Sequence, residues 1–144
     1  MRETGEQLQS EMLSREFALS GTLAALPPAR DAIMEFIRPH CGGEQQELDI
    51  MIALQEALAN AIVHGCQGDA GKMVRCTVDI SPSAIELTVR DPGQGFDTTS
   101  SDDLSEDGTN LTRHGRGIQL ICGLMDEVSY RHRGTELHLK KLRS

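Results

Sequence analysis

The segment from about Glu44 to Val63 constrains the fold more than any other part of the sequence. It predicts a long helix whose apolar residues are spread around much of its circumference, so the helix has to pack on more than one side. Glu56, Asn60 and His64 recur in it at four-residue spacing, which puts a carboxylate, an amide and an imidazole on one side of a helix. The predicted apolar positions of this helix are Leu48, Ile52, Leu54, Leu58, Ala59 and Ile62.

The elements around this helix predict one α+β domain. The prolines of "LPPARDAIMEFIRPHCGG" favour a helix that begins with them and ends near Pro39. Alternating polar and apolar residues in "KMVRCTVDIS" and "AIELTVRD" predict an antiparallel hairpin. With an edge strand at 15–21, a short helix near 117–126 and two last strands, the order is β-α-α-β-β-loop-α-β-β. We expect a two-layer α/β sandwich: a mixed, mostly antiparallel sheet with helices on one face. A flexible leader over 1–14 precedes the domain at 15–144.

Composition and charge narrow the class of partner. The 144-residue chain carries a net charge of −8 and has no Trp, one Tyr and three Phe. A nucleic-acid backbone would be repelled by this charge, and base stacking needs aromatic side chains, so nucleic acid is not an expected partner. The sequence has neither the apolar core of a signal peptide nor a membrane-spanning run, which favours a cytoplasmic protein without a membrane partner. Its four scattered cysteines are then expected to be structural thiols.

Two glycine clusters, "DPGQG" and "HGRG", flank a long polar stretch that has almost no apolar residues. A stretch of this kind inside a compact domain is typical of a lid or binding loop, which we place at about 97–114. Neither cluster fits a P-loop, and the dinucleotide fingerprint fails because Thr98 and Leu120 stand where its third glycine belongs. The remaining option is a pocket in which the second cluster opens a helix, whose unpaired N–H groups favour phosphate.

The motifs "EALANAIVHG", "DPGQGF", "HGRGIQL" and "GTELHL" occur in this order, separated by the polar stretch. In this the chain resembles the GHKL ATPases with their Bergerat ATP-binding fold and mobile ATP lid. It is most similar to the small serine kinases that act as bacterial anti-sigma factors and switch-protein kinases. The resemblance covers about 17–142.

The resemblance implies a role for each matching residue, with ATP and Mg²⁺ as cofactors. Glu56 matches the general base that accepts the proton of the attacking hydroxyl, and Asn60 matches the Mg²⁺ ligand. Asp91 matches the carboxylate that accepts a hydrogen bond from the exocyclic amine of adenine. The other nucleotide-binding positions implied are Gly93, Gly95, His114, Gly115, Arg116, Gly117 and Thr135.

Several of these positions have a second interpretation. His64 is either catalytic or a helix-end histidine that makes a local hydrogen bond or lines the mouth of the pocket. Arg116 reaches either a phosphate or a protein partner, and Thr135 is either near the nucleotide or a residue of ordinary strand preference. The lid is acidic, so it does not attract ATP by charge and is equally consistent with a solvated loop.

The resemblance implies a protein serine/threonine kinase that phosphorylates a STAS-domain anti-anti-sigma protein. It also implies sequestration of a sigma factor or another regulator, and a homodimer. A binding module that holds ATP or ADP and sequesters partners without kinase activity is the alternative. A third hypothesis is an interaction domain that binds no nucleotide.

Overall fold

A five-stranded antiparallel sheet forms one layer of the protein. The computed structural model describes residues 12–93 and 116–143. The strand order across the sheet is β1-β2-β3-β5-β4, and every one of these neighbouring pairs is antiparallel. The strands are β1 Leu13–Ser20, β2 Met73–Ile80, β3 Ala84–Arg90, β4 Glu127–Arg131 and β5 Glu136–Leu142.

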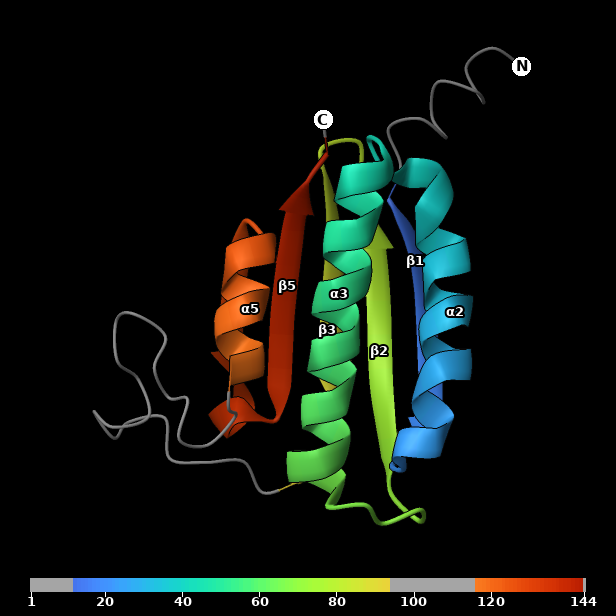
Figure 1. Ribbon diagram of the computed structural model, residues 1–144, viewed down its shortest axis with the longest axis vertical. Helices are drawn as coiled ribbons and strands as arrows, with labels where there is room; N and C mark the ends of the chain where they lie inside the picture. Colours follow the sequence, from blue (N-terminus) through green and yellow to red (C-terminus); the bar gives the residue numbers. More distant parts are fainter. Residues whose placement is uncertain (1–11, 94–115, 144) are drawn as a thin grey trace.

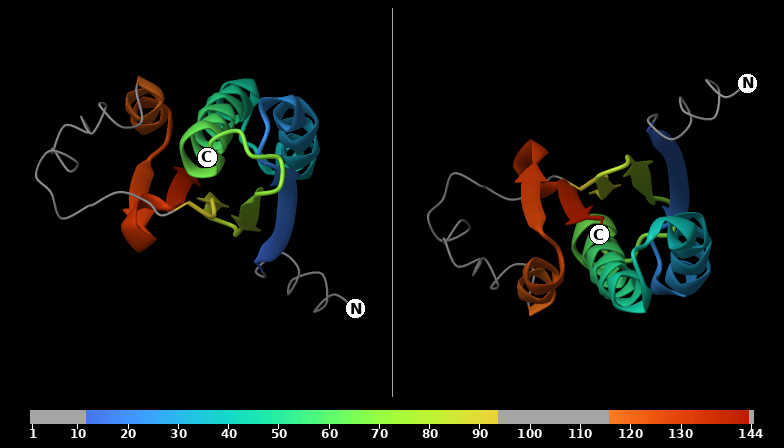
Figure 2. Two further views of the ribbon diagram at one scale, coloured as in Figure 1. Left: turned by 90° about the horizontal axis from the view of Figure 1, so that it is seen from below. Right: turned by 90° about the horizontal axis from the view of Figure 1, so that it is seen from above.

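Three helices cover one face of this sheet, as Figures 1 and 2 show. They are α2 Leu26–Ile37, α3 Glu44–Asn60 and α5 Arg116–Leu124, and α3 continues into a π-helical turn, η3 Ala61–Cys66. Helix α3 lies in the middle, packed against α2, α5 and the sheet. Its buried residues are Ile50, Ala53, Leu54, Ala57 and Leu58. The prediction that this helix packs on more than one side is therefore confirmed.

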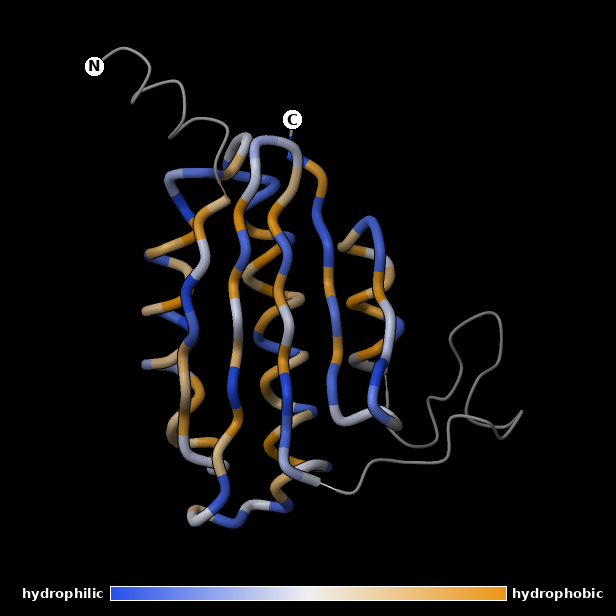
Figure 3. Tube along the Cα trace, turned by 180° about the vertical axis from the view of Figure 1, so that it is seen from behind, coloured by the Kyte–Doolittle hydropathy of each residue, from blue (hydrophilic) through white to orange (hydrophobic). Residues whose placement is uncertain are grey.

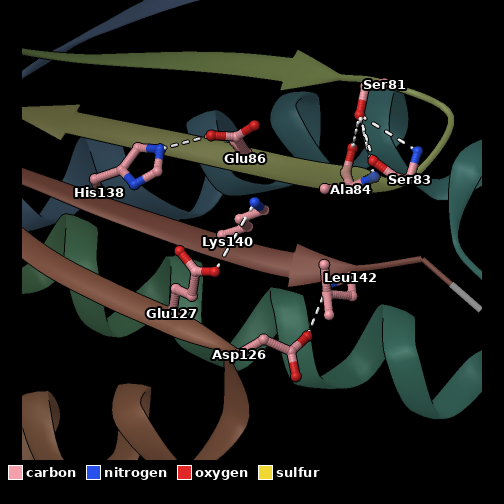
Figure 4. A network of polar contacts seen from close by, with 9 residues as sticks. All are labelled: Ser81, Ser83, Ala84, Glu86, Asp126, Glu127, His138, Lys140 and Leu142. Carbon is pink, nitrogen blue, oxygen red and sulfur yellow. Dashed lines mark hydrogen bonds and ion pairs between the residues drawn. The ribbon is translucent and has the colours of Figure 1, made fainter.

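The core lies between the helices and the sheet because strand side chains alternate between the two faces. Leu87, Val89 and Leu139 point under the helices and are at most 2% exposed. No described helix covers the opposite face, and hydrophilic and hydrophobic residues alternate along the strands (Figure 3). Figure 4 shows a hydrogen bond between Nε2 of His138 and Oε1 of Glu86 at 2.8 Å, and an ion pair between Lys140 and Glu127 at 3.9 Å, both on this open face.

The β2–β3 hairpin forms where the sequence predicted it. Ser81 closes the turn: its Oγ accepts hydrogen bonds from the backbone N–H groups of Ser83 and Ala84 at 3.4 and 3.1 Å (Figure 4). Pro27 and Pro28 lie at the start of α2, where the missing N–H groups have no helical partner to lose.

The predicted α+β fold class is confirmed, and the structure corrects details of it. Every described strand pairing is antiparallel, so the parallel part of the expected mixed sheet is not found among these strands. Strand β1 begins at Leu13, inside the segment predicted as leader. Leu48 is 44% exposed instead of buried, because it lies away from both neighbouring helices and the sheet. The α-helical geometry ends at Asn60, and the next turn is a π-helix.

Candidate functional site

The predicted site residues that the structure describes gather at one end of the molecule. Figure 1 shows that α3 and β3 end there, that α5 begins there, and that the β4–β5 turn closes there. Segments far apart in the sequence therefore meet at a single edge of the sandwich. The amide of Asp91, directly after β3, donates to the carbonyl of Thr135, directly before β5, at 2.9 Å. This bond joins two of the predicted nucleotide-binding residues.

Glu56 and Asn60 lie one turn apart near the end of α3, and both are half-buried. The side-chain nitrogen Nδ2 of Asn60 is buried without a hydrogen-bond partner among the described residues. Burying an amide group without a partner costs about 1–3 kcal/mol, so such a group in a folded protein indicates a function or a missing ligand. In the described part of the chain, no hydrogen bond or ion pair engages the carboxylate of Glu56.

His64 lies in the π-helical turn η3, outside the α-helical segment that holds Glu56 and Asn60. It is exposed. Its role in the site stays a prediction.

Asp91 is partly buried at the end of β3, and burial raises the pKa of its carboxyl group above the usual value. The hydrogen bond from the backbone N–H of Gly93 to Oδ1, at 2.8 Å, opposes this shift. The second oxygen, Oδ2, accepts no hydrogen bond from the described residues. A carboxylate oxygen in this position is free to accept from an amine of a ligand.

Gly65 is a residue of this site that sequence reasoning missed. A Cβ at Gly65 would overlap the side chain of Asp91. A Cβ at Gly93 would lie 2.9 Å from both Asp91 Oδ1 and the carbonyl oxygen of Gly65. The backbone of Gly65 has no positive φ, and the left-handed residues that end the helix are Gln67 and Gly68, with φ of 55° and 75°. Glycine is therefore required at 65 because the Asp91 side chain lies so close to its backbone, and not because of the backbone conformation of a turn. The signal in the sequence was the glycine inside the helical segment before "CQG".

Thr135 ends the β4–β5 turn beside Asp91. Its hydroxyl donates to the carbonyl of His132 at 2.8 Å, which stabilises a turn whose residues His132 and Gly134 have φ of 54° and 88°. The hydroxyl oxygen keeps its capacity to accept a hydrogen bond. The structure thus places Thr135 next to Asp91 and also gives its side chain a local structural role.

The second glycine cluster lies at the start of α5. Gly95, His114 and Gly115, and the lid predicted at about 97–114, fall outside the described residues. The backbone of Arg116 and Gly117 forms the first turn of α5. The N-terminal end of that helix points toward the same end of the molecule as Asp91 (Figure 1), as the prediction of a phosphate-binding helix start requires.

A family model described as the histidine kinase-like ATPase domain matches residues 19–141. The chain belongs to this family. The match covers α2, α3, the hairpin, α5 and most of β5, so both glycine clusters and the Glu56–Asn60 pair lie within the histidine kinase-like ATPase domain. This is the superfamily that the motifs predicted.

Proteins named anti-sigma F factor are similar to this domain along most of its length. Those of Bacillus thuringiensis (strain Al Hakam) and Bacillus anthracis (strain CDC 684 / NRRL 3495) are each 31% identical over 118 residues. Each match covers 78% of this chain and 81% of the relative.

Among solved structures, the chain is similar to the RsbU and RsbW domains of Rv1364c from Mycobacterium tuberculosis, with a TM-score of 0.62 and 15% identity. That match covers 91% of this chain and 32% of the other, so this chain spans about a third of that two-domain structure. This likeness supports the fold. None of the described helices is long and apolar enough to cross a membrane.

The described residues fit the nucleotide and Mg²⁺ that such a domain implies. Mg²⁺ takes few protein ligands beside water and phosphate oxygens, and the side chain of Asn60, half-buried at the end of α3, has an amide oxygen of the kind that Mg²⁺ binds. The atom without a described partner, Nδ2, is a hydrogen-bond donor and does not bind a cation. Within residues 12–93 and 116–143, no group of three His, Cys, Asp or Glu side chains could hold a metal by itself. Asp91 offers a partly buried acceptor, and the glycines at 65 and 93 lie so close to its side chain that a Cβ at either position would collide with it.

The four thiols are free, and two of them, those of Cys66 and Cys76, belong to the core. Cys66 and Cys76 are fully buried, and burial raises the pKa of the Cys76 thiol to about 12. Burial, followed by the charge of Asp91, also raises the pKa of Cys66. Thiols held in the protonated form are poor nucleophiles, which agrees with the structural role predicted for them.

Proposed function

We propose that this chain is an ATP-dependent serine kinase that phosphorylates a STAS-domain antagonist protein. We also propose that it sequesters a sigma factor or another regulator in a partner-switching pathway. The observation that carries the proposal is the pair on the last turns of α3, at the end of the molecule where Asp91 lies. Among the described residues, none forms a hydrogen bond or ion pair with the carboxylate of Glu56, and Nδ2 of Asn60 is buried with no partner. The relatives named anti-sigma F factor support the same class of regulator.

In the proposed reaction Glu56 accepts the proton from the hydroxyl of the attacking serine. The serine oxygen forms a bond to the γ-phosphorus of ATP, the bond from that phosphorus to the β–γ bridging oxygen breaks, and ADP leaves. Asn60 contributes an amide oxygen to the metal, and Asp91 accepts a hydrogen bond from the amine of adenine. Gly93 and Gly95, with His114, Gly115, Arg116, Gly117 and Thr135, complete the proposed nucleotide site. Bound Mg²⁺ supplies neutralisation of phosphate charge. The amine contact favours adenine, because guanine presents a carbonyl acceptor at that position.

The test is a phosphorylation assay of the purified chain with Mg-ATP and a candidate STAS-domain partner, with phosphosites mapped by mass spectrometry. We expect phosphoserine on the partner and a loss of about 10²–10⁴-fold in rate for Glu56→Gln, the usual contribution of a general base. Glu44→Gln is the matched control, because Glu44 is exposed in the first turn of the same helix. It should leave the rate unchanged.

The alternatives give different results. Binding of ATP or ADP without phosphoserine on any captured partner would favour the partner-sequestering module. An unchanged melting temperature with Mg-ADP would favour the interaction domain without nucleotide, since a ligand at about a hundred times its Kd adds roughly 2.7 kcal/mol of stability. A pull-down with ATP and with ADP then identifies which partner each nucleotide state retains.

A further inference from the structure

Glu136, the first residue of β5, is the one buried charged side chain among residues 12–93 and 116–143. It is 5% exposed, and its Oε1 accepts hydrogen bonds from Nε and Nη2 of Arg90 at 3.1 and 2.7 Å. Nε2 of His132 lies 3.7 Å from the same oxygen. The side chain of Arg90 is 60% exposed. Hydrogen bonds to a charged group are shorter and stronger than neutral ones, and the two donors of Arg90 converge on the same oxygen of Glu136.

Stability alone is a weak reason for such a pair. A buried carboxylate loses its hydration, and an ion pair often only offsets that loss. Glu136 and Arg90 are cross-strand partners on the open face of the sheet, the side that also carries His138 and Lys140. Threonine or valine would satisfy strand preference at these positions without a buried charge. Neither stability nor strand preference explains the pair, so we look for its role in the residues next to it in the sheet.

The pair forms the rung directly beside the candidate site. Arg90 precedes Asp91 and Glu136 follows Thr135, so the Arg90–Glu136 rung adjoins the hydrogen bond from Asp91 to Thr135. The chain enters β5 from the β4–β5 turn, in which His132 and Gly134 have positive φ values. Strand ends fray when nothing fixes them, and here the side-chain pair fixes both strands at their last paired residues.

The pair lies on the opposite side of the sheet from the side chain of Asp91. Successive strand residues point to opposite faces, and Asp91 packs against Gly65 on the helix side. Arg90 and Glu136 therefore do not line the site. They act on it through the backbone that carries Asp91 and Thr135.

We propose that Arg90 and Glu136 are positioning residues for Asp91, and that they set the selectivity of this chain for a purine with an amine at position 6. The proposal rests on the proposed function, because it requires a nucleotide at Asp91. A carboxylate that moves by a fraction of an ångström loses a directional hydrogen bond to the amine but little of the contact with ribose and phosphate. If Asp91 is positioned less firmly, the preference for a purine with an amine at position 6 should therefore fall more than the affinity for nucleotides in general.

The experiment measures the Kd of ADP and of inosine 5′-diphosphate, which has a carbonyl at position 6, for the full chain and its variants. We expect ADP to bind three- to tenfold more weakly to Glu136→Gln and Arg90→Met, because the charge-assisted hydrogen bond to Asp91 is weakened and not lost. The Kd of inosine diphosphate should change by less than about twofold. Arg90→Lys keeps the charge and should restore part of the selectivity.

Arg75→Met is the matched control, because Arg75 is the cross-strand neighbour of Arg90 on β2 and is likewise exposed. It removes the same charge from the same face without touching Glu136, and should keep the selectivity of the wild type. If Glu136→Gln does not fold, Arg90→Met carries the test, since it alters a largely exposed side chain.

Three results overturn the proposal. The first is a wild type that binds ADP without preferring it over inosine diphosphate. The second is a pair of variants with lower melting temperatures but the ADP preference of the wild type, which would make the pair structural only. The third is equal weakening of both nucleotides. A wild type that binds neither nucleotide contradicts the proposed function itself, and the inference falls with it.

Discussion

Gly65 and Asp91 are in direct contact, so that a single methyl group at 65 would overlap the carboxylate. Gly65 lies in the turn after α3, and Asp91 lies at the end of β3. The contact therefore joins the helix that carries Glu56 and Asn60 to that strand. It therefore fixes the distance between the two halves of the candidate site. A site assembled from separate elements depends on such close packing between their backbones.

Gly65→Ala is expected to displace Asp91 and to abolish detectable ADP binding. The added Cβ has no room, and overpacking of this kind costs about 1–3 kcal/mol of stability. Binding is measured by calorimetry and stability by chemical denaturation. Gly123→Ala is the control: nothing lies within 4 Å of a Cβ there, and Gly123 lies in α5. It should bind ADP normally and gain up to about 1 kcal/mol of stability. Normal ADP binding by Gly65→Ala would contradict the site geometry.

Asp91→Asn should stabilise the protein without nucleotide while removing its nucleotide binding. Burial raises the pKa of Asp91 above its ordinary value of 3.8, so the folded state holds this proton more tightly than the unfolded chain. Stability then falls as pH rises from 3.8 through the folded-state pKa, and the full penalty is present at neutral pH. Asparagine carries no charge, so the Asp91→Asn variant does not have this penalty.

The measurement is the melting temperature of both proteins, with and without ADP, across this pH range. The stability advantage of Asp91→Asn should be absent at acid pH and should grow toward neutral pH. A constant difference at every pH would contradict the assignment of the penalty to the carboxylate of Asp91.

Asn60→Ala is expected to separate folding from metal binding. Because Nδ2 is buried with no described partner, removing the amide relieves a penalty of about 1–3 kcal/mol and should not lower the free energy of unfolding. Mg²⁺ should strengthen ADP binding to the wild type but not to Asn60→Ala. Asn60→Asp keeps an oxygen ligand and should retain the Mg²⁺ effect. A full Mg²⁺ effect in Asn60→Ala would remove Asn60 from the metal site.

Lys141→Met tests a polar contact between the helices and the sheet. Nζ of Lys141 donates to the carbonyl of Leu124 at 2.5 Å and lies 3.4 Å from Oδ2 of Asp49, with both charged side chains less than 20% exposed. Loss of the lysine leaves these acceptors unpaired and should cost about 1–3 kcal/mol in urea denaturation. Lys140→Met is the control, because its pair with Glu127 at 3.9 Å is more exposed and should contribute less than about 1 kcal/mol. Equal costs would show that burial does not distinguish the two lysines.

Much of the fold could be predicted from the sequence because local patterns determine local structure. The prolines at the start of α2 and the alternation in β2 and β3 each act over a few residues, and the helix and the hairpin formed as predicted. The types of residue at the candidate site could also be predicted, since Glu56, Asn60 and Asp91 are polar residues that interrupt or end apolar patterns. The π-helical turn after Asn60 was not predicted, because such a turn has no clear signature in the spacing of residues.

By itself, then, the sequence determined the elements, their order and the chemistry available to the site. Only the tertiary structure decided that Gly65 packs against Asp91 and that Arg90 pairs with a buried Glu136. These contacts join residues from different elements, and they depend on the length of α3 with its π-helical turn and on the register of β3 against β5. Register and helix length are settled by packing of the whole core, so no local pattern encodes the contacts that they create.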